Sequence, residues 1–70
     1  MGQSQGIAFN NLRTNKKYRL TNYGEQTEFV ILDVHPNDFL LKDIHTLEQF
    51  WMSELISYGK GEDFSIWEIR

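Results

Sequence analysis

The residues best suited to chemistry in this chain are two histidines, His35 and His45, and ten acidic side chains. Histidine together with carboxylates is typical of metal sites and of acid–base catalysis. The two histidines, however, fall in predicted turns at opposite ends of one strand, and at about 3.3 Å per residue they should lie roughly 20 Å or more apart. No HExxH, paired CxxC or calcium-loop pattern is present. We therefore expect no metal and no cofactor.

Nucleophilic catalysis would need one of three serines, Ser53, Ser57 or Ser65, but no nucleophile-elbow sequence surrounds them. The run 59–61, Gly-Lys-Gly, is similar to phosphate-cradling loops, yet the P-loop spacing and its Lys-Ser/Thr pair are absent. A flexible connection is the simpler interpretation, in which Asp63 binds backbone amides of its own loop. We expect that the protein is not an enzyme.

Basic side chains gather near the start of the sequence. Residues 1–19 contain four of them and no acid, whereas residues 20–70 contain three basic and ten acidic side chains; the four are Arg13, Lys16, Lys17 and Arg19. Such a segment can contact the phosphates of a nucleic acid. Nucleic-acid binders usually spread basic charge over the whole domain, however, and the rest of this chain is acidic. A nucleic-acid-binding accessory domain is therefore the alternative function.

Three aromatic residues are candidates for a partner surface: Trp51, Tyr58 and Trp67. If the chain around each tryptophan is a strand, each tryptophan lies on the face opposite its apolar neighbours, and one of these two sets of side chains stays partly exposed. Exposed aromatic side chains on a domain usually mark a surface that binds a partner, although packing in the core is the other interpretation. The favoured function is therefore a non-enzymatic module for protein interaction or self-association, with another protein or a second copy as partner.

Length and composition indicate a single domain without a membrane partner. A chain of 70 residues buries only about 60% of its unfolded surface, which leaves room for one modest core. We expect that core in residues 16–70 and a flexible arm over the polar residues 1–15. There is no cysteine, no secretory signal at the start, and no apolar run longer than 29–32. These features favour a cytoplasmic location.

Alternating polar and apolar residues predict strands over 17–21, 28–35 and 39–44, with turns at 22–25 and 35–38, and a last strand over 64–69. Residues 46–59 are ambiguous. A capping-box pattern at Thr46 and Gln49, with apolar residues at helical spacing, fits one helix over 46–58 in an α+β fold. The same residues also fit a turn at 45–48, a strand over 49–52 and a helical turn over 53–58.

The second interpretation is favoured, and it predicts a mainly-β fold. Three meandering strands, a fourth strand, one short helical turn and a last strand form the plan of an SH3-like small barrel of about five antiparallel strands. The first strand, KKYRLTNY, departs from the SH3 domains that bind proline-rich peptides, so that activity is not expected here.

Residues 39–69 contain the motifs Tyr58-Gly59-Lys60-Gly61 and Asp63-Phe64. In these motifs the chain resembles short uncharacterised bacterial proteins that share a YGKGxDF ending. The resemblance implies a bacterial source and an SH3-like fold, and it implies no particular activity.

Overall fold

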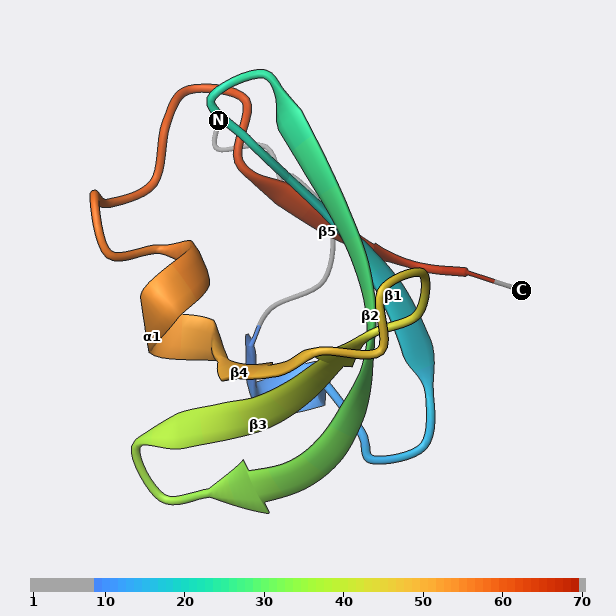
Figure 1. Ribbon diagram of the computed structural model, residues 1–70. Helices are drawn as coiled ribbons and strands as arrows, with labels where there is room; N and C mark the ends of the chain where they lie inside the picture. The colour runs from blue at the N-terminus through green and yellow to red at the C-terminus, as the bar shows by residue number, and fades with distance from the viewer. Residues whose placement is uncertain (1–8, 70) are drawn as a thin grey trace.

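The computed structural model, which describes residues 9–69, contains one open sheet of five antiparallel strands in the order β4-β3-β2-β1-β5 (Figure 1). A short 3-10 helix, η1, precedes the sheet and a single helical turn, α1, lies between the last two strands. The elements are η1 (Phe9–Asn11), β1 (Lys17–Asn22), β2 (Glu25–His35), β3 (Asp38–Asp43), β4 (Gln49–Trp51), α1 (Met52–Leu55) and β5 (Ser65–Glu68). The predicted mainly-β fold, with five antiparallel strands and a short helix before the last one, is confirmed.

The core lies on the inner face of the curved sheet. Alternate residues of neighbouring strands face inward, so that Tyr18 on β1 lies opposite Phe29 on β2, and Ile31 on β2 lies opposite Leu41 on β3. The buried apolar side chains are Leu12, Tyr18, Leu20, Phe29, Ile31, Leu41, Met52 and Ile66. They come from four strands, from α1 and from the segment before β1, which explains how so short a chain encloses a core.

The long strand β2 bends along its length, as Figure 1 shows, because its pairing with β3 slips by one residue between Ile31 and Asp33. A β-bulge of this kind leaves one residue unpaired and turns the strand away from its earlier direction. Beyond the bulge, Val34 pairs with Phe39 on the side of the sheet that bears Ile31 and Leu41, yet it is exposed. The end of the β2–β3 hairpin therefore projects from the core.

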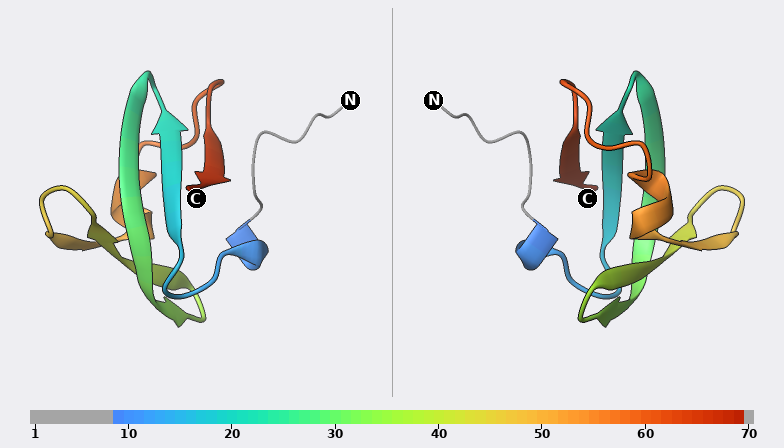
Figure 2. Two further views of the ribbon diagram at one scale, coloured as in Figure 1. Left: turned by 90° about the vertical axis from the view of Figure 1, so that its right-hand side faces the viewer. Right: turned by 90° about the vertical axis from the view of Figure 1, so that its left-hand side faces the viewer.

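Residues 9–15 differ from the loose arm predicted for 1–15, whose first eight residues lie outside the described part. The Phe9 ring packs edge-on against Phe39 and Phe64, with ring centres 6.0 and 6.1 Å apart, and Leu12 is buried. Figure 2 shows this segment at the β5 side of the sheet. Two apolar side chains three positions apart share one face of a helical turn, and that face covers the core.

The alternative with one helix over 46–58 is wrong. Asp43, at the end of β3, accepts hydrogen bonds from the backbone N–H groups of His45 and Thr46 (2.7 and 3.0 Å), which organises a turn instead of a first helical turn. Leu47 then takes a φ of 66°, a left-handed conformation that an α-helix cannot contain. The helix begins only after Trp51.

No helix among the described residues is both long and apolar enough to cross a membrane.

Candidate functional site

A hollow of about 380 Å³ lies where β4 meets the end of the β2–β3 hairpin. We call it the Trp51 hollow, and its walls are His35, Pro36, Asn37, Asp38, Trp51 and Ser53. Leu40 pairs with Trp51 across β3 and β4, and His35 pairs with Asp38 across the hairpin, so strand register brings these side chains together. The His35 ring stands edge-on to the Trp51 indole, with centres 5.1 Å apart. One wall of the hollow is therefore aromatic.

The other wall carries negative charge. The Ser53 hydroxyl donates to Asp38 Oδ2 (2.6 Å), and the Ser53 backbone N–H donates to Asp38 Oδ1 (3.0 Å). The hydrogen bond from the Ser53 hydroxyl lowers the pKa of Asp38, so this carboxyl is ionised at neutral pH. A second carboxylate, Asp33, lies 3.2 Å from His35 Nε2. The two hydrogen bonds between Ser53 and Asp38 also hold α1 against the start of β3.

Ser53 and His35, the serine and the histidine at the hollow, do not contact each other as a nucleophile and its base. Ser53 donates its hydroxyl hydrogen to Asp38, whereas His35 contacts Asp33, so the serine and the histidine have different partners. A nucleophilic serine needs a base that accepts its hydroxyl hydrogen, and that base must itself be oriented by a third group. Within residues 9–69, no three His, Cys, Asp or Glu side chains are grouped to hold a metal ion.

A smaller hollow of about 120 Å³ lies at the other end of α1, and we call it the Tyr58 hollow. Its lining residues are Leu20, Asn22, Tyr23, Glu25, Thr27, Leu55 and Tyr58. Helix α1 contributes to both hollows, with Ser53 in the first and Leu55 in the second. The Tyr58 side chain is 92% exposed. We refer to the two hollows with α1 between them as the α1 surface.

The loop 58–63, which contains most of the YGKGxDF motif, is held against the β1–β2 turn and is not a flexible connection. Buried Asn22 donates from Nδ2 to the Gly59 carbonyl (3.0 Å) and accepts at Oδ1 from the Gly61 N–H (2.7 Å). The Tyr23 hydroxyl donates to the Tyr58 carbonyl (2.9 Å). The motif therefore has a structural role, which is to hold Tyr58 beside the Tyr58 hollow.

Asp63 contacts a different segment from the one predicted. Its two carboxylate oxygens accept hydrogen bonds from the backbone N–H groups of Tyr23 and Gly24, each at 2.8 Å. These two residues form the β1–β2 turn with φ values of 50° and 77°, as a two-residue hairpin turn of the mirror-image type requires. The hydrogen bond from Gly24, assisted by that from Tyr23, lowers the pKa of Asp63. The prediction assigned to Asp63 the backbone amides that are its neighbours in the sequence, whereas the amides of Tyr23 and Gly24 lie far from it along the chain.

The three predicted surface residues do not form one patch. Trp51 and Tyr58 flank α1 and belong to the α1 surface, where Trp51 is 37% exposed. Trp67 lies on β5, at the opposite edge of the sheet from β4, and is 56% exposed beside its register partner Arg19. The α1 surface and the β5 edge are therefore two distinct candidates.

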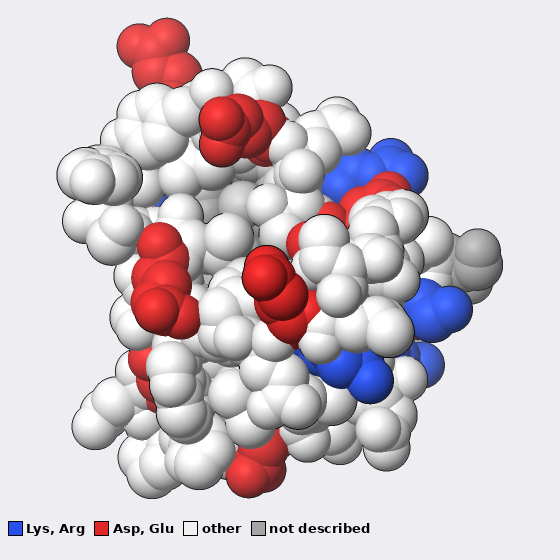
Figure 3. All heavy atoms as spheres, viewed as in Figure 1, with Lys and Arg blue, Asp and Glu red and all other residues white. Residues whose placement is uncertain are grey.

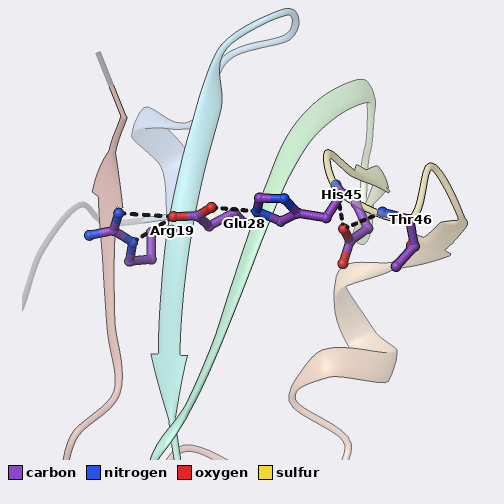
Figure 4. A network of polar contacts seen from close by, with 5 residues as sticks. Arg19, Glu28, His45 and Thr46 are labelled. Atoms are coloured by element: carbon purple, nitrogen blue, oxygen red, sulfur yellow. Dashed lines mark hydrogen bonds and ion pairs between the residues drawn. The ribbon is translucent and has the colours of Figure 1, made fainter.

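Among the basic candidates, Arg19 is part of a row of polar contacts across the outer face of the sheet (Figure 4). Its guanidinium donates to Glu28 Oε2 at 2.9 and 2.8 Å, and His45 Nε2 lies 2.6 Å from Glu28 Oε1. The hydrogen bonds from His45 and then from Arg19 lower the pKa of Glu28. A phosphate would have to compete with this carboxylate for Arg19.

The other basic candidates lie just before β1 and at its start. On the face that Figure 3 shows, Lys and Arg side chains lie mostly on the right of the view, and Asp and Glu are spread over the whole face. Arg13 donates from Nη1 to two carbonyls of its own segment (both 3.1 Å), and Lys16 Nζ lies 3.6 Å from Glu68. Lys17 is exposed. Arg13 and Lys16, like Arg19, therefore already contact groups of the domain itself.

The sequence interpretation missed His35, Asp38 and Ser53 as members of the site, because it treated His35 as a turn residue and considered Ser53 only as a nucleophile, for which no elbow sequence is present. The pairing register of the strands would have identified these residues. Once Leu40 is placed opposite Trp51, Asp38 follows two positions along β3 on the same face, next to His35 across the hairpin.

Comparisons of the chain with protein-family models, with curated proteins and with solved structures found no match. The resemblance to short bacterial proteins therefore stays a prediction, and function is argued from the α1 surface.

Proposed function

We propose that this protein is a non-enzymatic interaction module that holds a short segment of a partner protein on the α1 surface, with Trp51 as the anchor. The observation that carries the proposal is that Trp51, a large aromatic residue on an edge strand, walls a hollow of about 380 Å³ and stays 37% exposed. This volume is within the range of about 300–1,000 Å³ usual for ligand sites, but the hollow is shallow and open to solvent, which suits a segment of a protein partner better than an enclosed small molecule. Tryptophan is also among the residues that most often dominate the binding energy of an interface.

The hollow is held in shape by the domain itself. The Asp38–Ser53 hydrogen bonds fix α1 against β3, and the His35 ring packs on the Trp51 indole. Pro36 restricts the backbone of the turn that forms the rim. Because these groups are already ordered, a partner segment loses less free energy to ordering the site when it binds.

Self-association and nucleic-acid binding are the competing functions. Self-association would use the β5 edge with Trp67, whose side chain is exposed but lines neither the Trp51 hollow nor the Tyr58 hollow. Nucleic-acid binding would use the basic side chains near β1, of which Arg19 already has the carboxylate of Glu28 as its partner. The α1 surface therefore has the stronger support. We place the action of the module in the cytoplasm, in line with its cysteine-free sequence.

The test is selection of binding peptides from a random library displayed on phage, with the full chain immobilised. Selected peptides are synthesised and their affinities are measured for the wild-type protein, for Trp51→Ala and for Trp67→Ala. We expect Trp51→Ala to weaken binding at least about tenfold, as loss of a central aromatic anchor does. Trp67→Ala, a matched change on the other edge strand, should leave the affinity unchanged.

Equal binding of the selected peptides to wild-type protein and Trp51→Ala would contradict the proposal. The competing functions are tested on the same sample. A sedimentation coefficient that rises with protein concentration and falls back in Trp67→Ala would establish self-association. Salt-sensitive binding of single-stranded oligonucleotides that Lys17→Ala weakens would establish the nucleic-acid alternative.

A further inference from the structure

We infer that the Trp51 hollow takes a basic side chain, lysine or arginine, presented by the partner segment. This inference rests on the proposed function and names the chemistry of the group that the hollow recognises. Its support is the combination of an aromatic wall with one carboxylate in the lining, Asp38, and a second, Asp33, in contact with the lining residue His35, which together suit a cation on an apolar stem.

The charge around the hollow is negative. The lining residues, all within the described part of the chain, include one carboxylate, Asp38, and no Lys or Arg. Asp33 adds a second carboxylate through its contact with His35, and the side chain of Asp33 is 62% exposed. At the helix, Glu54 accepts a hydrogen bond from the Trp51 backbone N–H (2.8 Å), but it is not among the residues that line the hollow. An acidic partner residue would be repelled here.

The aromatic wall favours a cation over a neutral polar group. A cation near the face of a tryptophan ring is attracted by about 0.5–2 kcal/mol, depending on how far it is removed from water. The methylene stem of lysine or arginine can pack on Trp51 and Pro36 while its charged end stays near the carboxylates. The Ser53 hydroxyl contacts Asp38 Oδ2, and this carboxylate oxygen can accept a further hydrogen bond.

A purely apolar side chain would fit the hollow less well. It would contact Trp51 and Pro36, but it would also cover Asp38 and reduce the access of water to an ionised group. Covering a charge without giving it a partner is unfavourable. The hollow is therefore better matched to a side chain that is apolar along its length and positive at its tip.

The test is NMR titration of ¹⁵N-labelled protein with four pentapeptides, acetylated and amidated, that differ only in a central arginine, lysine, norleucine or glutamate. The signals followed are the Trp51 indole N–H and the Ser53 amide, with the Trp67 indole N–H as an internal reference. We expect the arginine and lysine peptides to shift the first two signals and to bind at least about threefold more tightly than the norleucine peptide. The glutamate peptide should cause the smallest shifts.

Two variants separate local charge from overall charge. Asp33→Asn removes one negative charge beside the hollow, and Glu62→Gln removes one in the loop 58–63. We expect Asp33→Asn to lower the affinity for the arginine peptide about threefold, as loss of a nearby exposed charge does, and to leave the affinity for the norleucine peptide unchanged. Glu62→Gln should change neither.

The inference is overturned if the norleucine peptide binds as tightly as the arginine peptide, if Glu62→Gln weakens binding as much as Asp33→Asn, or if no peptide shifts the Trp51 indole signal. Its failure is distinguishable from failure of the proposed function. Library peptides that depend on Trp51 but contain no lysine or arginine would reject the inference and keep the function. Library peptides indifferent to Trp51 would reject both.

Discussion

Gly61 shows how a single residue fixes the position of the candidate surface. A Cβ atom at this position would lie 2.9 Å from two carbon atoms of the Tyr23 ring. The ring is held in place because its hydroxyl donates to the Tyr58 carbonyl. The glycine thus allows the loop 58–63 to lie directly against the β1–β2 turn, and a side chain there would push the two apart.

We expect Gly61→Ala to destabilise the domain by about 1–3 kcal/mol, the usual cost of overpacking. In a Tyr23→Ala background the same change should cost less, because the two ring carbons that the new methyl group meets are gone and only the contact with Asn22 Oδ1 at 3.2 Å remains. Urea unfolding of the four proteins of this double-mutant cycle measures the difference. An equal cost in both backgrounds would show that the ring contact is not the cause.

The turns between elements decide what the secondary-structure pattern leaves open. Residues 46–58 have the spacing of an amphipathic helix, and Thr46 with Gln49 has the pattern of its cap. The chain instead forms a turn, a strand and a helical turn, since Asp43 organises the turn and Leu47 turns the backbone into the left-handed region. This turn also affects the candidate site, because a helix from residue 46 would have buried Trp51.

Leu47 offers a prediction at this scale. It has a φ of 66° and is 64% exposed, so its side chain adds conformational strain and little packing. Asparagine tolerates this conformation, whereas a β-branched residue does not. We expect Leu47→Asn to stabilise the domain and Leu47→Val to destabilise it, with a difference of at least about 1 kcal/mol between their free energies of unfolding. Equal stability of the two variants in thermal unfolding would contradict the strain.

The whole molecule should lose stability in acid, because four carboxyl groups have pKa values lowered by contacts in the folded state. They are Glu28, Asp38, Asp43 and Asp63. A group whose pKa is lower when folded stabilises the fold above its unfolded pKa, and this stabilisation is lost as the pH falls through the folded value. Loss should therefore begin near 4.5, the ordinary pKa of Glu28, and continue below 3.8, that of the aspartates.

Thermal unfolding followed by circular dichroism between neutral pH and pH 3 measures this loss as a falling midpoint. Asp43→Asn removes one of the four groups and keeps a side-chain oxygen for the turn, so its midpoint should fall less steeply with pH. A midpoint independent of pH in the wild-type protein would contradict the assigned contacts.

The sequence was sufficient to predict the arrangement of strands, because their alternation and the chemistry of the turns are local. It placed Trp51 and Trp67 on the strand faces opposite their apolar neighbours, which follows from the same period of two, but it left open whether they pack in the core; both are exposed. It could not predict that Asp63 binds the β1–β2 turn, or that residues 9–12 cover the core. Both depend on segments far apart in the chain meeting in space, and no local pattern records such a meeting.

The contacts of Asn22 and Asp63 also bear on how fast the chain folds. They join residues 37 to 40 positions apart, and β5 pairs with β1 across nearly the whole domain. Closing so long a loop costs entropy before any of these contacts can form, and domains with many distant contacts fold slowly. We therefore expect the β1–β2 hairpin to form early and the contacts of Asp63 with its turn to form only when the last strand pairs, so that the surface next to Tyr58 takes shape late in folding.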